Sequence, residues 1–145
     1  STYHLGLVMT YLQIILDEIY ETSSTTSKPS WPFTLNAIGF FALQYYLSGL
    51  LDFGGASNLS INIFLATYCG LGWWIFDKSK AGFVLGLLTA IAGPVAELFL
   101  INVLNLYTYT HADFLGISSW IPWVYFFGAS AVGNLARSVY NLQQP

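Results

Sequence analysis

The sequence contains very few charged residues. Only 8% of its 145 residues are Asp, Glu, Lys or Arg, whereas a typical soluble domain contains about 25%. Because so few charges cannot cover a folded core with a water-facing surface, the apolar residues must face something other than water. Four basic residues and a net charge of −3 also exclude a nucleic-acid-binding surface.

Cysteine and histidine are equally scarce. The single cysteine, Cys69, excludes an internal disulfide, and its place in an apolar run indicates a packing residue. The two histidines, His4 and His111, lie far apart in the sequence and show no zinc-ligand spacing. Neither a Gly-x-Ser-x-Gly nucleophile motif nor a glycine-rich phosphate loop occurs. We therefore predict a protein that is not an enzyme and has no metal site or certain cofactor.

Apolar residues make up 55% of the chain and form five long segments. Each segment is near the ~20 residues that a helix needs to span a hydrocarbon core. Backbone polar groups in lipid must be satisfied internally, so these segments should be helices. The sequence predicts an all-α transmembrane bundle with five spans, forming a single domain over residues 1–145. The segments are residues 3–19, 31–51, 59–76, 81–106 and a fifth that begins near residue 119 and ends by residue 137.

The basic residues agree with five alternating spans. Lys28 lies between the first two segments, Lys78 and Lys80 lie between the third and fourth, and Arg137 lies at the end of the fifth. All four then fall on one side of the membrane, which the positive-inside rule identifies as cytosolic, or stromal in a plastid. The basic side comprises residues 22–30, residues 77–80 and the C-terminus.

Tryptophans and small residues also fit a membrane bundle. Tryptophans occur near segment ends, where their rings can sit at the level of the lipid headgroups; they are Trp31, Trp73, Trp74, Trp120 and Trp123. Glycines in the fourth and fifth segments predict close helix packing; they are Gly82, Gly86, Gly93, Gly128 and Gly133.

Glu97 is the candidate for chemistry because it falls near the middle of the fourth segment. An ionised carboxylate in a transmembrane helix should face the bundle interior or a cavity. It could anchor a ligand hydroxyl or bind a magnesium tetrapyrrole. Alternatively, a protonated Glu97 could bond to Asn102 or Gln44. Pro94 could kink the helix and open a pocket beside Glu97, or it could be an ordinary transmembrane proline.

Several motifs in the second half occur in an order that resembles the Insig (insulin-induced gene) family of sterol-regulatory membrane proteins. They are Trp-Trp-Ile-Phe-Asp-Lys-Ser-Lys-Ala-Gly-Phe at residues 73–83, Tyr-Thr-Tyr-Thr-His-Ala-Asp-Phe at 107–114, Ser-Trp-Ile-Pro at 119–122 and Gly-Asn-Leu-Ala-Arg at 133–137. In the first half, residues 48–53 and Trp31 carry a thinner similarity.

This resemblance implies a six-helix bundle whose second to sixth helices match the five segments here, so the first is expected outside this chain. It also implies a membrane protein of the endoplasmic reticulum that holds a sterol or diacyl lipid in an intramembrane cavity and binds a membrane-protein partner. Asp77 matches the family's partner-binding aspartate, and Trp74 lies beside it. The candidate cavity residues are Phe41, Gln44, Ser60, Trp73 and Glu97.

Two departures from the family bear on the ligand. Ser60 stands where the animal proteins have a glutamine, and Glu97 stands where the family has uncharged residues. Asp77 also has a second interpretation, because a carboxylate can cap the N-terminus of the following helix.

An alternative function is an accessory subunit of a larger membrane assembly such as a photosystem. The chain begins with Ser1 rather than Met, so a transit peptide, a signal or another apolar segment could precede it. In a plastid thylakoid, chlorophyll or carotenoid would be the cofactor, and His4, Glu97 and His111 would be the candidate pigment ligands. A transporter that uses Glu97 as a proton relay is a weaker third hypothesis, because a lone carboxylate without an internal repeat supports it poorly.

Overall fold

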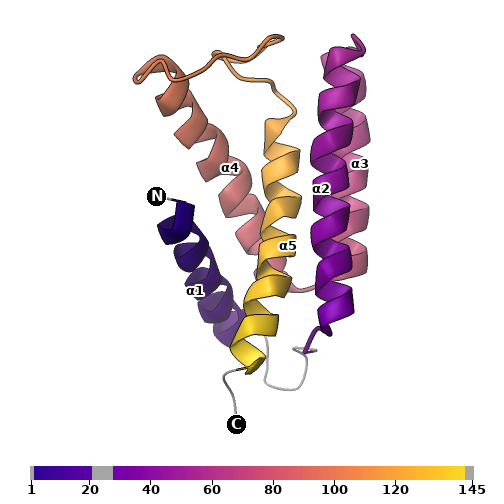
Figure 1. Cartoon of the computed structure of the whole chain (residues 1–145), viewed down its shortest axis with the longest axis vertical. Coiled ribbons are helices and arrows are strands. Elements are labelled where there is room, and N and C mark those ends of the chain that lie inside the picture. Colours follow the sequence, from indigo (N-terminus) through magenta and orange to yellow (C-terminus); the bar gives the residue numbers. More distant parts are fainter. Residues whose placement is uncertain (1, 21–27, 143–145) are drawn as a thin grey trace.

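The computed structural model describes residues 2–20 and 28–142, with side-chain positions from residue 7 onward. Within these ranges the chain forms five α helices and no β strand, apart from an isolated bridge between Phe114 and Ile117. The helices are α1 (Thr2–Tyr20), α2 (Trp31–Phe53), α3 (Asn58–Phe76), α4 (Lys80–Asn102) and α5 (Ile121–Leu142) (Figure 1). The predicted all-α class is confirmed.

Helix α5 is the centre of the bundle. It packs against each of the other four helices, with α2 and α3 on one side and α1 and α4 on the other (Figure 1). The α2 and α3 helices also pack against each other, as do α1 and α4. A long irregular segment from residue 103 to residue 120 connects α4 to α5 across one end of the bundle.

Glycines let aromatic side chains of α5 lie directly on the neighbouring helices. A Cβ atom on Gly72 of α3 would lie 2.5 Å from the Phe127 ring, and one on Gly86 of α4 would lie 2.8 Å from the Phe126 ring. Real Cβ atoms do not approach other atoms so closely, so only glycine fits at these two positions. The predicted role of small residues in close packing is confirmed.

The bundle buries several polar side chains beside its hydrophobic core and exposes an apolar exterior. Buried polar side chains include Gln13, Thr34, Gln44, Ser130 and Asn134, while many large apolar side chains of α2, α3 and α4 are exposed. Both α3 and α4 are long and apolar enough to cross a membrane. An outer surface of this kind suits contact with lipid, because lipid chains are as apolar as the side chains that they touch.

The ends of α4 and α5 differ from the predicted segments. Helix α4 runs through Pro94 and ends at Asn102 rather than residue 106, where the Asn102 amide donates hydrogen bonds to the carbonyls of Leu98 and Leu115. Helix α5 continues past Arg137 to Leu142. The charge of Arg137 does not end the helix because its side chain points inward, to carboxylates of the bundle.

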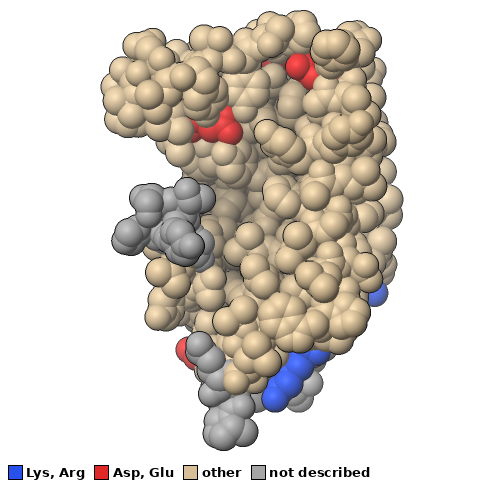
Figure 2. All heavy atoms as spheres, in the orientation of Figure 1, with Lys and Arg blue, Asp and Glu red and all other residues tan. Residues whose placement is uncertain are grey.

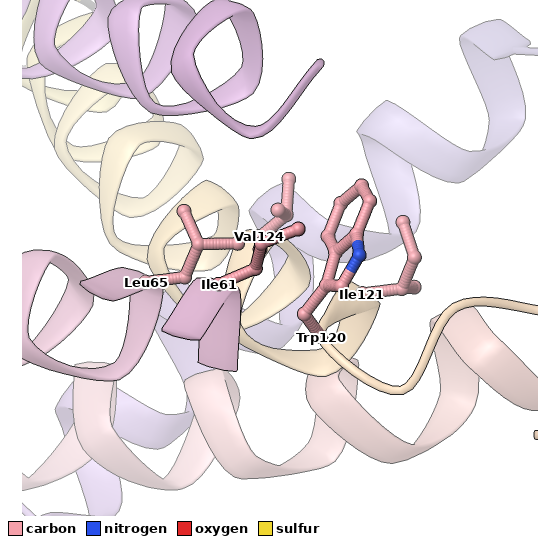
Figure 3. Close-up of a cluster of buried hydrophobic side chains, with 5 residues drawn as sticks. All are labelled: Ile61, Leu65, Trp120, Ile121 and Val124. Carbon is pink, nitrogen blue, oxygen red and sulfur yellow. The ribbon is translucent and has the colours of Figure 1, made fainter. Parts of the chain in front are cut away.

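The expectation that Trp120 anchors at the membrane interface is wrong. Its side chain is buried in a cluster with Ile61 and Leu65 of α3 and Ile121 and Val124 of α5 (Figure 3). The segment at residues 103–120 folds back over the end of the bundle, and the Trp120 ring is therefore buried. Among the other tryptophans, Trp31, Trp74 and Trp123 are exposed and Trp73 is half-buried.

The four Lys and Arg residues lie at one end of the bundle. Lys28 precedes α2, Lys78 and Lys80 belong to the α3–α4 turn, and Arg137 contacts that turn from α5. All Lys and Arg atoms visible in Figure 2 accordingly lie at the lower end of the molecule. This grouping is the one that the charge pattern predicts, while the side of the membrane on which it lies stays a prediction.

Candidate functional site

A half-buried carboxylate and two tyrosines form a polar cluster between α4, α5 and the segment that connects them. The Tyr125 hydroxyl of α5 donates a hydrogen bond to Glu97 Oε1 at 2.7 Å, and the Tyr109 hydroxyl donates one to Oε2. Gly93 lies one turn before Glu97 and makes room for the Tyr125 ring, which would be 2.4 Å from a Cβ there. We call Glu97, Tyr109 and Tyr125 the tyrosine–glutamate cluster.

The environment of this cluster changes the acidity of the tyrosines in the connecting segment. Burial, and next the hydrogen bond to Glu97 and its negative charge, raise the pKa of Tyr109 well above its ordinary value. The pKa of nearby Tyr107 is also raised, first by burial and then by Glu97. Both hydroxyls therefore keep their protons at neutral pH and remain donors, while both Glu97 oxygens act as acceptors.

The place and partners of Glu97 differ from those expected. Because α4 ends at Asn102, Glu97 lies near the last turns of the helix and not near its middle. The alternative of a bond to Asn102 or Gln44 is wrong, since Asn102 donates to backbone carbonyls and Gln44 Nε2 donates to the Trp123 carbonyl at 3.3 Å. Tyrosines take their place because the connecting segment brings Tyr109 back over α4.

Phe41 and Gln44, both predicted to line a cavity, point from α2 toward α5. Phe41 is half-buried and its ring lies 6.4 Å from that of Phe127. Gln44 is fully buried, and its Oε1 atom has no hydrogen-bond partner in the part of the chain that the structure describes. A Cβ on Gly128 would lie 3.1 Å from the Phe41 ring, so the two helices are in close contact here.

Ser60 and Trp73 occupy opposite ends of α3 and lie roughly 20 Å apart along the helix. Ser60 is exposed in the first turn, where its backbone N–H donates to the N-cap Ser57. Trp73 is half-buried near the α3–α4 turn and donates from Nε1 to the Ser79 carbonyl at 3.3 Å. The two side chains cannot contact the same polar group of one ligand.

A second polar cluster lies at the basic end of the bundle. Arg137 of α5 donates two hydrogen bonds to the Asp17 carboxylate of α1, at 2.8 and 2.7 Å, and one to Asp77 Oδ1 at 3.1 Å. It also donates to Ser79 Oγ at 3.0 Å. We call Asp17, Asp77, Ser79 and Arg137 the arginine cluster. It joins α1 to the α3–α4 turn through α5.

Asp77 and Trp74, the predicted partner-contact residues, differ in exposure. The Asp77 side chain is fully buried and bound to Arg137 and Ser79. It does not itself cap α4, because Ser79 is the N-cap and accepts from the Gly82 N–H at 2.9 Å. Trp74 is 58% exposed, and the Lys78 ammonium group lies 4.4 Å from the centre of its ring.

The candidate pigment ligands do not come together in the described residues. His111 is exposed in the connecting segment, where its Nδ1 lies 3.2 Å from Asp52 Oδ1. Glu97 is bonded to two tyrosines. His4 belongs to the first turn of α1, and its side chain lies outside the described part of the structure.

Comparison with known proteins identifies the family. The model of the insulin-induced protein (INSIG) family matches residues 5–140. The chain belongs to the Insig family. Its similarity to insulin-induced gene 1 protein reaches 38% identity over 113 residues for Danio rerio and 35% over 112 residues for Homo sapiens, each covering 77% of this chain. The chain spans 43% and 39% of those two relatives.

Solved structures show the same Insig fold. A mycobacterial Insig homolog from Mycobacterium vanbaalenii superposes on 97% of the chain and 70% of its own length, with a TM-score of 0.81 and 13% identity. A cross-linked trimer of that homolog matches with a TM-score of 0.76 and 16% identity. The predicted family and helical membrane bundle are thus confirmed. The mycobacterial homolog and this chain share the fold although their sequences are only 13–16% identical.

Sequence reasoning missed the residues that complete both polar clusters. Tyr109 and Tyr125 are 12 and 28 residues from Glu97 in the sequence, and Asp17 is 120 residues from Arg137. The available signal was charge balance, because a carboxylate in an apolar segment requires a partner. Arg137 was interpreted as a marker of topology and as part of a family motif, although the bundle has a carboxylate on α1 to pair with it.

Proposed function

We propose that this Insig-family chain is a non-enzymatic membrane protein that binds a sterol or a diacyl lipid and docks onto another membrane protein. The tyrosine–glutamate cluster is the observation that carries the ligand proposal. A half-buried carboxylate held by two hydroxyl groups is a fixed polar anchor beside lipid-facing helices. Ionisable groups within transmembrane helices are costly and are most often functional.

Apolar surface suited to hydrocarbon lies on the same helix as the anchor. Ile91, Val95 and Phe99 are exposed at four-residue spacing and form one face of α4. An amphipathic lipid requires both environments, a polar group for its head and apolar surface for its body. Phe41, Gln44, Ser60 and Trp73 remain candidates for contacts with the body of the ligand.

Lipid retained through purification tests the ligand proposal. We expect mass spectrometry of the purified protein to detect one lipid species enriched over its proportion in the membrane. The Glu97→Gln variant should lose that species, because an amide is uncharged and only one of its two terminal atoms is an acceptor. Co-purified lipid with the composition of the bulk membrane would contradict the proposal.

For docking, we propose the surface of the α3–α4 turn around Trp74. An exposed tryptophan that carries a lysine over its ring combines apolar area with charge, a composition common at binding hot spots. Asp77 is buried behind this surface and holds the turn in place through its contacts with Arg137 and Ser79. By family resemblance the membrane is that of the endoplasmic reticulum, with the basic end in the cytosol. No observation favours the photosystem or pigment alternative.

Native gels of digitonin-solubilised membranes test the docking proposal. Trp74→Ala should shift the protein from a larger complex to its own size, because the ring supplies the contact area. Trp31→Ala is the matched control, since Trp31 is also exposed and begins α2 at the same end. A complex that survives Trp74→Ala, or that both variants dissociate, would contradict this assignment.

A further inference from the structure

The Glu97 carboxyl group of the tyrosine–glutamate cluster has no Lys or Arg partner among the described residues. The chain has four Lys and Arg residues, and all lie at the opposite end of the bundle. The nearest of them along α4 is Lys80, which is 17 residues and therefore roughly 25 Å from Glu97. Near a membrane interior an ionised carboxylate requires either hydrogen bonds or a cation. The tyrosines supply the hydrogen bonds, and none of the four Lys and Arg residues supplies a positive charge.

Tyrosine rings lie beside the carboxylate. Tyr109 and Tyr125 contact it directly, and the rings of Tyr107 and Tyr109 are 6.2 Å apart. Quaternary ammonium ions are attracted to carboxylates by charge and to aromatic rings through the ring quadrupole. The cluster thus combines the two features that such a cation requires.

We propose that the tyrosine–glutamate cluster binds the trimethylammonium group of a choline phospholipid. This inference rests on the lipid binding proposed above and specifies the headgroup, so it favours a diacyl lipid over a sterol. Both Glu97 oxygens already accept tyrosine hydroxyls. A trimethylammonium group suits this carboxylate because it has no N–H to donate and interacts through charge alone. A primary ammonium would compete with the tyrosines for the same oxygens.

The surroundings of the cluster fit the rest of a phospholipid. Trp120 belongs to the buried cluster against which Tyr109 and Tyr125 pack, and its Nε1–H has no acceptor among the described residues. A phosphate or ester oxygen is an acceptor that this donor could use. Figure 2 shows the surface hollowed below the connecting segment, on the α4 side of the bundle, with acidic atoms at the upper edge of this hollow.

Native mass spectrometry with four lipids of identical acyl chains tests the headgroup. The purified protein is mixed with equimolar dioleoyl phosphatidylcholine, phosphatidylethanolamine, phosphatidylglycerol and diolein. We expect the phosphatidylcholine complex to exceed the phosphatidylglycerol complex about tenfold, from charge pairing and cation–π contacts together. Glu97→Gln should reduce this preference to within about twofold.

Two further variants keep the test decisive. Tyr107→Leu removes one ring from an exposed loop position and should lower the phosphatidylcholine preference about threefold, whether or not Glu97→Gln folds. Glu18→Gln neutralises an exposed carboxylate near the other end of the bundle and should leave the preference unchanged. Equal binding of all four lipids, unchanged by Glu97→Gln and Tyr107→Leu, would overturn the headgroup inference alone. Failure to bind any of the four lipids, or a sterol added in the same way, would overturn the proposed lipid binding as well.

Discussion

Arg137 pairs with two carboxylates that come from distant parts of the chain. Its side chain is 12% exposed and the Asp77 side chain is fully buried, so these charges interact with little screening by water. The two parallel hydrogen bonds to Asp17 use the planar fork of the guanidinium group, which lysine cannot reproduce. Arg137 therefore holds three elements in a single arrangement.

Removing Arg137 should destabilise the bundle strongly. Arg137→Met leaves the Asp77 carboxylate buried without its cation, and loss of one partner of such a pair costs about 3–5 kcal/mol. Arg137→Lys should cost less, because the charge remains. The measurement is the free energy of unfolding in detergent, with Lys28→Met at an exposed position as the control. Equal stability of Arg137→Met and the wild type would show that the arginine cluster is dispensable.

Tyr109 should make the bundle sensitive to alkaline pH. Its pKa in the folded chain is raised above the ordinary value of 10.0 by burial and by Glu97. The unfolded chain therefore loses this proton first, and the free energy of unfolding falls as the pH rises above about 10. Tyr109→Phe should be less stable at pH 7 by about 1 kcal/mol, since a hydrogen bond is lost, but its stability should fall less steeply above pH 10. Parallel pH profiles of thermal unfolding for the wild type and Tyr109→Phe would contradict this account.

At the residue level the sequence identified the unusual charge but not its surroundings. Glu97 stood out because a carboxylate within an apolar segment is rare. Its tyrosine partners could not be predicted, since they depend on the return of the segment at residues 103–120 across the end of α4. Asp77 was recognised as important from its motif, but whether it is buried or exposed depends on Arg137.

The elements were predicted well where a polar residue ends an apolar run. Helix α2 begins at Trp31, after Pro29 and the N-cap Ser30, and α3 ends at Phe76, directly before Asp77. Prediction failed at the ends of α4 and α5, where composition misleads. Apolar residues continue beyond Asn102 although the helix stops there, while Arg137 interrupts the apolar run although α5 continues.

Two glycines on α3 should respond oppositely to alanine. Gly72→Ala places a methyl group against the Phe127 ring, where the distance would be 2.5 Å, and should destabilise the α3–α5 contact by about 1–3 kcal/mol. Gly70 lies on the same helix with nothing within 4 Å of its Cβ position. Gly70→Ala should therefore stabilise the helix, by up to about 1 kcal/mol.

Thermal unfolding of both glycine variants in the same detergent distinguishes packing from helix propensity. The melting temperature should fall for Gly72→Ala and stay equal or rise for Gly70→Ala. If the melting temperatures of both variants rise, helix propensity dominates and the close contact between α3 and Phe127 does not limit stability.

For the whole molecule, composition was sufficient to predict a helical membrane bundle, but it did not indicate how the helices pack. Low charge and five apolar segments predict the class. Helix α5 is central because its small residues and inward polar groups contact the other helices. A single sequence shows these residues but not the contacts that they make. That residues 1–145 form one independent domain stays a prediction.

The grouping of the basic residues makes a prediction about the orientation of the whole molecule. In a Cys69→Ala background, a cysteine replacing Lys78 should react with a membrane-impermeant maleimide added from the cytosolic side, and one replacing Ala112 should react only from the opposite side. Both positions are exposed. Labelling of the Lys78 position from the opposite side would reverse the proposed orientation.

Photo-crosslinking with a lipid that carries a diazirine near its headgroup tests the central claim most directly. We expect peptide mapping to place the crosslinks on the last turns of α4, on residues 103–120 and on the first turns of α5, around Glu97. Glu97→Gln should remove these crosslinks and leave the weaker labelling of the outer helix faces. Crosslinks spread evenly over the exposed faces of α2 and α3, and unchanged by Glu97→Gln, would contradict a lipid held at the tyrosine–glutamate cluster.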